Sequence, residues 1–320
     1  MKEILKTDLT ILGTEIKKGS SIFLEMEVAK LHTRNHISVP VIVERAIKDG
    51  PVLLLLGGVH GDETNGVAIV RDIIRKKYNK PECGTIICIP VLNSFGYLNQ
   101  TREFPDGRDL NRMFPGSPQG SLASQFAHKF MIEIAPHVDY VLDFHTGGAA
   151  RENYPNVRYC EGQEINSKLV DVFNAPFVVH SNYIPKSLRD AINKLGKPIL
   201  LFEGGKSLQL NSFVVKVGVE GAMNVMKYLG IHSGDPVKNN NPIVVKKSKW
   251  IRAPHSGLFE SVVENGSFAS KKTILGRISD PYGEFQKNLF APNDCYIFGL
   301  NTSPIVNKGD AIFHVSTEVE

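Results

Sequence analysis

Cysteine is scarce in this chain of 320 residues. The four cysteines are Cys83, Cys88, Cys160 and Cys295, and they form neither a CxxC pair nor a dense framework. Their spacing excludes a zinc-ribbon or redox CxxC motif and a disulfide-stapled fold, and it fits a reducing compartment. We interpret them as small buried hydrophobic residues and expect a cytoplasmic protein.

Excess charge of one sign and long apolar runs are absent as well. The formal net charge is +4, and no stripe of arginine and lysine interleaves with aromatic residues, which argues against a nucleic-acid partner. No apolar run approaches the roughly 18 residues of a membrane span, and the start MKEILKTDLT has no apolar signal segment. We therefore expect no membrane partner. The expected partner is a small-molecule substrate, and the sequence leaves open whether the chain forms a homo-oligomer.

Apolar segments typical of strands alternate with helical segments from about residue 20 to residue 230. The expected strands are 21–31, 37–47, 51–58, 84–92, 138–145, 177–181 and 197–205, and the expected helices are 65–77, 121–135 and 164–173. Such alternation predicts the α/β class, with a mixed, largely parallel sheet and helices on both of its faces.

Polar side chains follow three of these strands, in the stretches GGVHGDE, DFHTGG and FEGG. Ligands collect at the carboxyl ends of parallel strands, so His60, Glu63 and His145 are candidates for one site. A catalytic zinc ion takes about three protein ligands of these types and leaves a position for water. The alternative is that both histidines only bond nearby backbone groups, since H-x-x-E alone is a weak motif.

Glu203 is a carboxylate at the end of another apolar strand. Burial would raise its proton affinity, and a neighbouring activated water would give it a proton to accept, which suits a general base. The alternative is a helix or turn cap.

The long loop of residues 93–120 concentrates groups that bind carboxylates. It carries Arg102, Arg108, Asn111 and Arg112. Guanidinium groups grip carboxylates at two points, and long ordered loops in compact domains are usually functional. The alternative is a solvated basic loop in which Asp106 and Asp109 are the partners.

The tail repeats itself. Residues 253–278 align without a gap over residues 291–316, and Ala-Pro begins both halves. We expect a small all-β domain of two interlocked hairpins, packed close enough to wall the site, which gives the domains 1–240 and 241–320.

Four stretches in this order, GGVHGDETNG, PDGRDLNRMFPG, DFHTGG and FEGG, resemble the succinylglutamate desuccinylase/aspartoacylase family, relatives of the zinc carboxypeptidases. The resemblance covers roughly residues 20–320. It implies a zinc carboxypeptidase-like fold, one Zn²⁺ held by His60, Glu63 and His145, and Glu203 as general base. It also implies that Asn111 and Arg112 bind a substrate carboxylate, that either Arg102 or Arg108 polarises the scissile carbonyl, and that Arg189 is a further substrate-side arginine.

These observations predict a zinc-dependent amidohydrolase that removes an N-acyl group from a small amino acid or amine carrying a carboxylate. One alternative is a metallocarboxypeptidase that acts on short peptides with the same machinery. Another is a catalytically silent binding relative, against which the intact set of His60, Glu63, His145 and Glu203 speaks.

Overall fold

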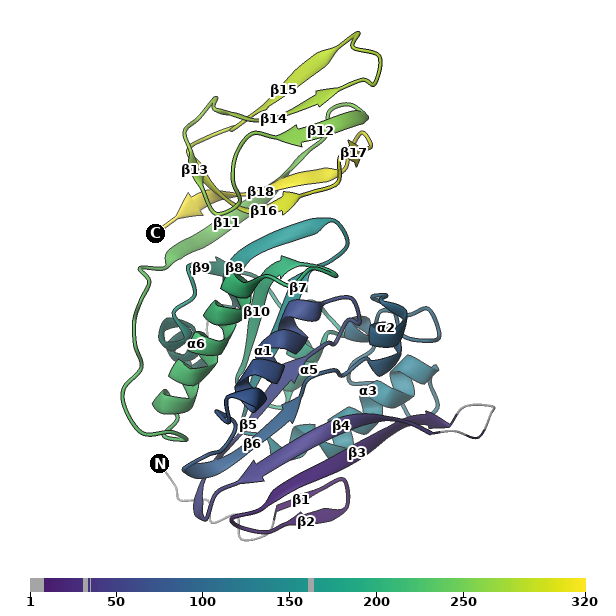
Figure 1. Ribbon diagram of the computed structural model, residues 1–320, viewed down its shortest axis with the longest axis vertical. Coiled ribbons are helices and arrows are strands. Elements are labelled where there is room, and N and C mark those ends of the chain that lie inside the picture. Colours follow the sequence, from purple (N-terminus) through teal and green to yellow (C-terminus); the bar gives the residue numbers. More distant parts are fainter. Residues whose placement is uncertain (1–8, 31–33, 35, 161–163) are drawn as a thin grey trace.

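The structure is a computed structural model that describes residues 9–30, 34, 36–160 and 164–320. We call residues 9–230 the α/β region and residues 243–320 the tail region. Figure 1 shows the tail region at one end of the α/β region, with β8 and β9 next to the junction. No helix among the described residues is long and apolar enough to cross a membrane.

The α/β region alternates strands and helices, as the sequence predicts. Its strands are β1 (Leu9–Ile11), β2 (Thr14–Ile16), β3 (Ser21–Lys30), β4 (His36–Arg45), β5 (Lys48–Gly57), β6 (Cys83–Ile89), β7 (Tyr140–Gly147), β8 (Arg151–Tyr159), β9 (Phe177–His180) and β10 (Ile199–Lys206). Its helices are α1 (Thr64–Arg75), α2 (Ser94–Asn99), α3 (Leu122–Glu133), α4 (Glu164–Phe173), α5 (Leu188–Lys194) and α6 (Ser212–Tyr228), with short 3₁₀ turns η1 (Leu110–Arg112) and η2 (Ala135–His137).

Among the described residues, twelve strands drawn from both regions form one sheet in the order β13-β16-β18-β11-β9-β8-β10-β7-β5-β6-β4-β3. Two smaller sheets have the orders β1-β2 and β15-β14-β12-β17. Strands β6, β5, β7 and β10 run parallel to one another in the centre of the large sheet, whereas β4 and β8 pair antiparallel with their neighbours β6 and β10. The mixed α/β fold is therefore confirmed.

Strand β5 shows why both faces of the sheet are covered. Leu53 and Leu55 pack into a core with residues of α1, α4 and α6, while Leu54 and Leu56 pack into a second core with residues of α3 and α5. Successive strand side chains point to opposite faces, so a run of leucines is stable only between two apolar layers. The strand can therefore offer polar groups to solvent only at its end, where His60 follows.

The tail region contains no helix in the described structure. Its strands are β11 (Ile243–Arg252), β12 (Gly257–Ser261), β13 (Phe268–Ala269), β14 (Ile274–Ser279), β15 (Gln286–Phe290), β16 (Cys295–Asn301), β17 (Ile305–Val306) and β18 (Ala311–Val319). In each half of the repeat the first strand pairs with the third, β12 with β14 and β16 with β18. The middle strand of each half pairs with the other half, β13 with β16 and β17 with β12.

Five strands close a barrel across the junction of the two regions. Strand β8 pairs with β9, β9 with β11, β11 with β18, β18 with β16, and β16 again with β8. Phe177, Val179, Val245 and Phe298 form a small apolar cluster drawn from these strands. The tail region is thus joined to the α/β region by backbone pairing on two sides.

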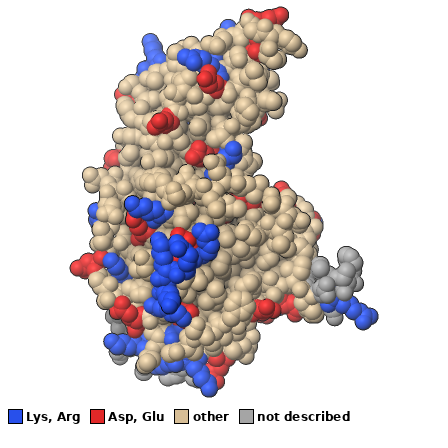
Figure 2. Space-filling view, viewed as in Figure 1, with Lys and Arg blue, Asp and Glu red and all other residues tan. Residues whose placement is uncertain are grey.

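Charged side chains on the face drawn in Figure 2 are unevenly spread. Basic side chains gather over α1, where Arg71 and Arg75 flank Asp72 in ion pairs of 3.0 and 3.3 Å. Much of the rest of this face carries neither sign of charge.

Candidate metal centre

His60, Glu63 and His145 come from two neighbouring parallel strands. His60 lies in the turn after β5, Glu63 is the residue before the first turn of α1, and His145 lies near the end of β7. Gly66 brings the start of α1 against β7, because a Cβ at this position would lie 2.2 Å from the carbonyl oxygen of Phe144. The helix start therefore delivers Glu63 to the side of His145.

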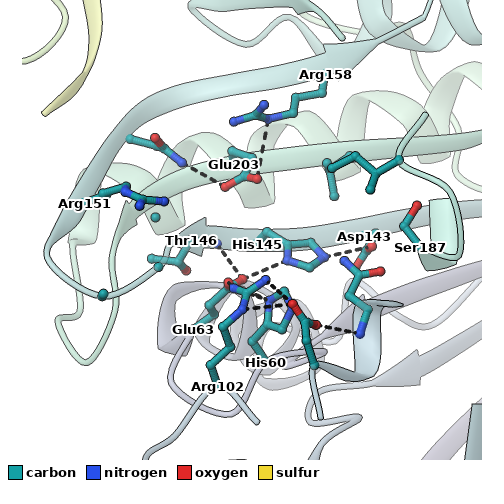
Figure 3. A pocket seen from close by; sticks show the side chains of 18 of the residues that line it. His60, Glu63, Arg102, Asp143, His145, Thr146, Arg151, Arg158, Ser187 and Glu203 are labelled. Atoms are coloured by element: carbon teal, nitrogen blue, oxygen red, sulfur yellow. Dashed lines mark hydrogen bonds and ion pairs between the residues drawn. The ribbon is translucent and has the colours of Figure 1, made fainter. Parts of the chain in front are cut away.

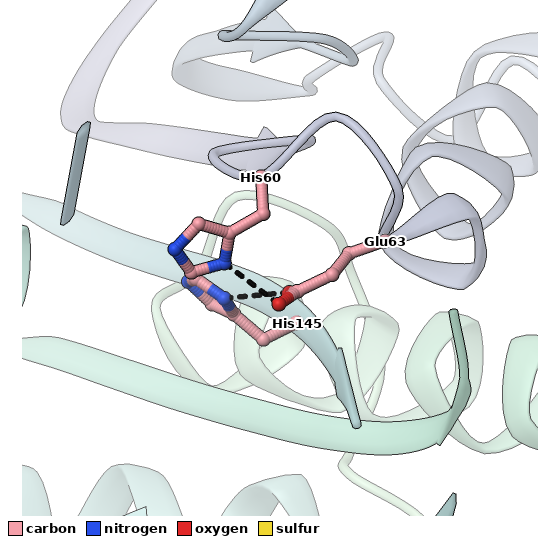
Figure 4. Close-up of side chains that lie close together, drawn as sticks. All are labelled: His60, Glu63 and His145. Atoms are coloured by element: carbon pink, nitrogen blue, oxygen red, sulfur yellow. Dashed lines mark hydrogen bonds and ion pairs between the residues drawn. The ribbon is translucent and has the colours of Figure 1, made fainter. Parts of the chain in front are cut away.

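The ligand atoms of these three residues converge. They all lie within 4.8 Å of one another, and each residue is at most 3% exposed. Figure 4 shows the Nδ1 atoms of both histidines facing the Glu63 carboxylate, at 2.7 Å for His60 and 2.8 Å for His145. The predicted metal ligands are thus brought together in a buried cluster of two nitrogens and a carboxylate.

The outer nitrogens of both histidines are held by carboxylates. His60 Nε2 lies 3.1 Å from Asp109 Oδ1, and His145 Nε2 lies 3.0 Å from Asp143 Oδ2. A proton on each Nε2 leaves the Nδ1 lone pair directed at the centre; metal-binding histidines usually donate their other ring N–H to a carboxylate in this way. The donor set therefore fits a divalent metal ion.

The charged groups of the cluster shift one another's pKa values. Burial disfavours charge on His145, but Asp143 and Glu63 outweigh it and raise the pKa of His145 well above its usual value. Burial likewise opposes ionisation of Glu63, but His60 and His145 hold the pKa of that carboxyl well below its usual range. Glu63 thus stays ionised while His145 favours its protonated form, so a bound cation would displace the proton of the histidine.

Arg102 reaches into the centre, and Arg108 does not. Arg102 Nη1 donates to Glu63 Oε1 at 3.1 Å, and its Nη2 donates to Asp109 Oδ2 at 2.9 Å. Arg108 is half-exposed, pairs with Asp106 at 3.4 Å, and is not among the described residues that line the cavity. Of the two arginines expected near the scissile carbonyl, Arg102 contacts the centre, whereas the loop turns Arg108 toward its own Asp106.

Glu203 lies beside the centre on the next strand. Its backbone is in register with His145 between β10 and β7. Figure 3 shows its side chain between Arg158 and His145, with Oε1 3.5 Å from Arg158 Nε. Asn153 Nδ2 donates to Oε2 at 2.9 Å. Glu203 lines the cavity, and no backbone N–H among the described residues donates to its carboxylate, so it is not a helix or turn cap.

The other predicted residues line the same cavity, of about 810 Å³. Asn111 is fixed by the backbone N–H of Leu188, which donates to its Oδ1 at 2.8 Å, and Arg112 beside it is exposed to solvent. Arg189 is buried, donates to the carbonyl of Ser181 and lies 4.7 Å from the ring centroid of Tyr183. Burial lowers the pKa of its guanidinium.

Several cavity residues were not predicted from the sequence. They are Asp143, Arg151, Asn153, Arg158, Trp250 and His314. Asp143 stands two residues before His145 in the strand, a spacing that could have indicated a shared face. Trp250 and His314 belong to the tail region and carried no signal, but they confirm that the tail packs close enough to wall the cavity.

A profile of the succinylglutamate desuccinylase/aspartoacylase catalytic domain matches residues 49–229. The chain belongs to this family. The N-alpha-acetyl-L-2,4-diaminobutyric acid deacetylase of Halomonas elongata is 27% identical over 302 residues, which are 89% of this chain and 87% of that protein. The names of the family and of this relative are those of deacylases.

Solved structures of the desuccinylase/aspartoacylase family share the fold. The succinylglutamate desuccinylase/aspartoacylase of Rhodobacter sphaeroides is 25% identical, with a TM-score of 0.81 over 94% of this chain and 96% of that chain. The product-bound ectoine utilization protein EutE (DoeB) of Ruegeria pomeroyi is 22% identical, with a TM-score of 0.83 over 95% and 97%. These matches include the tail region, since they cover nearly the whole chain.

Proposed function

We propose that this protein is a zinc-dependent deacylase that hydrolyses the N-acyl bond of a small amino acid or amine carrying a carboxylate. The observation that carries the proposal is the convergence of His60 Nδ1, Glu63 and His145 Nδ1 in a family whose members are named as deacylases. The curated relative supports it, because its own name is that of an N-acetyl diaminobutyrate deacetylase.

The donor set supports zinc among the divalent metals. Two imidazole nitrogens and a carboxylate, with no cysteine among the described residues that line the cavity, suit a catalytic zinc site. A zinc ion bound there would supply Lewis acidity and a water of lowered pKa.

Glu203 is the proposed general base. Its carboxylate faces the cavity beside His145, and Asn153 fixes Oε2 while Arg158 lies near Oε1. It would accept a proton from the attacking water and return it to the amine nitrogen. In the reaction a water oxygen bonds to the acyl carbon, the C–N bond breaks, and the amine leaves with the proton.

Arg102 is placed to stabilise negative charge on the carbonyl oxygen, because its guanidinium already points at the centre and is braced by Asp109. On the other side of the cavity, Asn111 and Arg112 are proposed to hold the carboxylate of the amine half. The guanidinium of Arg112 is solvent-accessible and hydrogen-bonds to the backbone of Asn111 at 2.7 Å, so it is available to an incoming anion.

A substrate screen tests the proposal. The zinc-loaded protein is incubated with N-acetyl, N-succinyl and other N-acyl amino acids and with dipeptides, and release of free amine is followed. We expect hydrolysis of at least one acyl amino acid carrying a carboxylate. Cleavage of dipeptides alone would favour the carboxypeptidase function over the deacylase function. If the zinc-loaded protein turned over none of these substrates, both functions would be contradicted.

A further inference from the structure

The strand that carries Glu203 loses its regular pairing directly after this residue. Between β10 and β7 the register shifts between Glu203 and Lys206, and between β10 and β8 it shifts between Glu203 and Gly205. Gly205 has a φ of 75°, in the left-handed region that favours glycine. The segment therefore forms a bulge, a distortion that is common beside active sites and that redirects neighbouring side chains.

The segment after the bulge is held from the side of α1 by Asn65. This residue lies in the first turn of α1, two positions after Glu63, and is completely buried. Its Nδ2 donates to the carbonyl of Gln209 at 2.8 Å and to that of Lys206 at 3.3 Å, and its Oδ1 accepts the N–H of Asn211 at 2.8 Å. One amide side chain thus bonds to three positions of the segment that follows Glu203.

Asn65 also packs against the bulge itself. A Cβ on Gly205 would lie 2.6 Å from Asn65 Nδ2 and 3.2 Å from its Cγ. The amide therefore leaves the bulge no room to move toward α1. Further along the segment, Leu208 donates its backbone N–H to the carbonyl of Asp62 at 2.9 Å, which ties the segment to the turn that carries His60.

The spacing between the metal centre and the proposed base depends on these contacts. Glu63 belongs to one side of them, the start of α1, and Glu203 belongs to the other, the end of β10. A displacement of about 1 Å in a reacting group can cost about 10²-fold in rate. Asn65 is not among the described residues that line the cavity, so its effect on the reaction has to pass through the backbone of β10.

We propose that Asn65 is a positioning residue, which acts through the bulge at Gly205 to set the place of Glu203 relative to the metal ligands. The inference rests on the proposed function, in which Glu203 is the general base, and adds to it a residue that contacts neither substrate nor metal. Loss of the amide changes the rate of the bond-breaking step far more than it changes substrate binding or metal affinity.

A double-mutant cycle of Asn65→Ala with Glu203→Gln tests the proposal on the best substrate of the zinc-loaded protein. Asn65→Ala alone should lower kcat by about 10-fold to 10²-fold, with KM within about threefold. Its affinity for zinc, measured by competition with a chelator, should stay within about threefold, because all three ligands remain. In the Glu203→Gln background Asn65→Ala should cost less than about twofold, because the base that it positions is already lost.

Asn224→Ala is the matched control. Asn224 is a buried residue of α6 whose Nδ2 donates to the carbonyl of Val237 at 2.8 Å and whose Oδ1 accepts the N–H of Val237 at 2.9 Å. Like Asn65 it fixes a following segment to a helix, but it does so away from the cavity. Its loss should lower the free energy of unfolding and leave kcat within about twofold.

Three kinetic results would overturn the proposal: an unchanged kcat in Asn65→Ala, a loss of zinc affinity as large as the loss of kcat, or an equal loss of kcat in both backgrounds of the cycle. If Asn65→Ala does not fold, Gly205→Ala takes its place, since its methyl group is forced against Asn65 Nδ2. It should show the same fall in kcat with KM and zinc affinity retained.

Hydrogen exchange separates failure of this proposal from failure of the deacylase function, because it needs no turnover. In Asn65→Ala the backbone amides of residues 204–211 should exchange at least about tenfold faster, whereas Asn224→Ala should leave them unchanged. Unchanged exchange in Asn65→Ala contradicts the proposal even if N-acyl compounds are hydrolysed. Faster exchange in a protein that hydrolyses none of them supports the contact and contradicts the proposed function.

Discussion

The metal centre and the mouth of the closed barrel lie in one cavity but are built on opposite electrostatic rules. The barrel mouth is lined by Arg151, Arg158, Trp250 and His314. At the metal centre each histidine contacts two carboxylates, and Arg102 lies between Glu63 and Asp109. At the barrel mouth Arg151 has no carboxylate partner in the described structure, and His314 is neutral.

This contrast separates the part of the cavity that the protein fixes by paired charges from the part that it does not. Where charged side chains are paired within the protein, their positions are set before the substrate binds. Groups that take part in a reaction benefit from such preorganisation. The metal centre should therefore tolerate little change in any member, whereas changes at the barrel mouth should have smaller effects.

The largest expected effect is loss of a metal ligand. His145→Ala removes a nitrogen donor and leaves Asp143 without its histidine partner. Bound zinc should therefore fall from one equivalent toward none, and turnover should drop by about 10³-fold or more. Metal content is measured after gel filtration, with His255→Ala, an exposed histidine of the tail region, as control. One full equivalent of zinc in His145→Ala would remove His145 from the site.

Glu203→Gln separates the base from the metal site. The amide cannot accept a proton, so turnover should fall by about 10²-fold to 10⁴-fold while bound zinc stays at one equivalent. Rate and metal content are measured on the same preparation. A rate near that of the unaltered protein would move the base to another residue.

The two loop arginines provide a paired test of position. Arg102→Gln removes a donor aimed at the centre and should lower kcat by about 10²-fold. Arg108→Gln alters an arginine that contacts Asp106 outside the cavity and should keep kcat within about twofold. Reversed effects in steady-state assays would show that the loop adopts another arrangement with substrate.

Asp143→Asn should weaken the metal centre without emptying it. Loss of the carboxylate at His145 Nε2 typically costs about 10-fold to 100-fold in metal affinity. Competition with a chelator measures the dissociation constant, and Asp72→Asn on the exposed side of α1 is the control. Unchanged affinity in Asp143→Asn would mean that His145 is oriented by other contacts.

The smallest effect concerns stability at the barrel mouth. Because burial and the nearby Arg158 lower the folded-state pKa of His314 from 6.5 to about 3, the unfolded chain takes up a proton below pH 6.5 that the folded chain does not. As the pH is lowered from 6.5 to 3, the contribution of His314 should decrease the free energy of unfolding by up to about 1.4 kcal/mol per pH unit. Denaturant titrations at pH 7 and pH 5.5 should show a smaller loss in His314→Gln, and equal losses would refute a buried neutral histidine.

The convergence of His60, Glu63 and His145 could be predicted from the sequence more readily than the walls around them. His60, Glu63 and His145 follow strands, and parallel strands bring their ends together, so a local pattern sufficed. Choosing Arg102 over Arg108 required the path of the loop. Asp109 contacts His60 and Asp143 contacts His145, and the sequence pattern gives no sign of either contact.

The barrel was not predicted, because its neighbours are distant in sequence. Strand β8 reads RENYPNVRY, which has few apolar residues and a proline, so it gave no clear strand signal. The helix α6 was also not predicted, and neither was strand β11, whose lysines are typical of a solvated segment. Its edge pairs with β9 of the α/β region, a partner that periodicity cannot identify.

Anomalous diffraction at the zinc edge, from crystals of the zinc-loaded protein, tests the metal site at the centre of this account most directly. The account predicts one strong peak within bonding distance of His60 Nδ1, His145 Nδ1 and a Glu63 carboxylate oxygen, with both Nε2 atoms still on Asp109 and Asp143. A peak elsewhere in the cavity, or a zinc ion bound through Nε2 of either histidine, would contradict it.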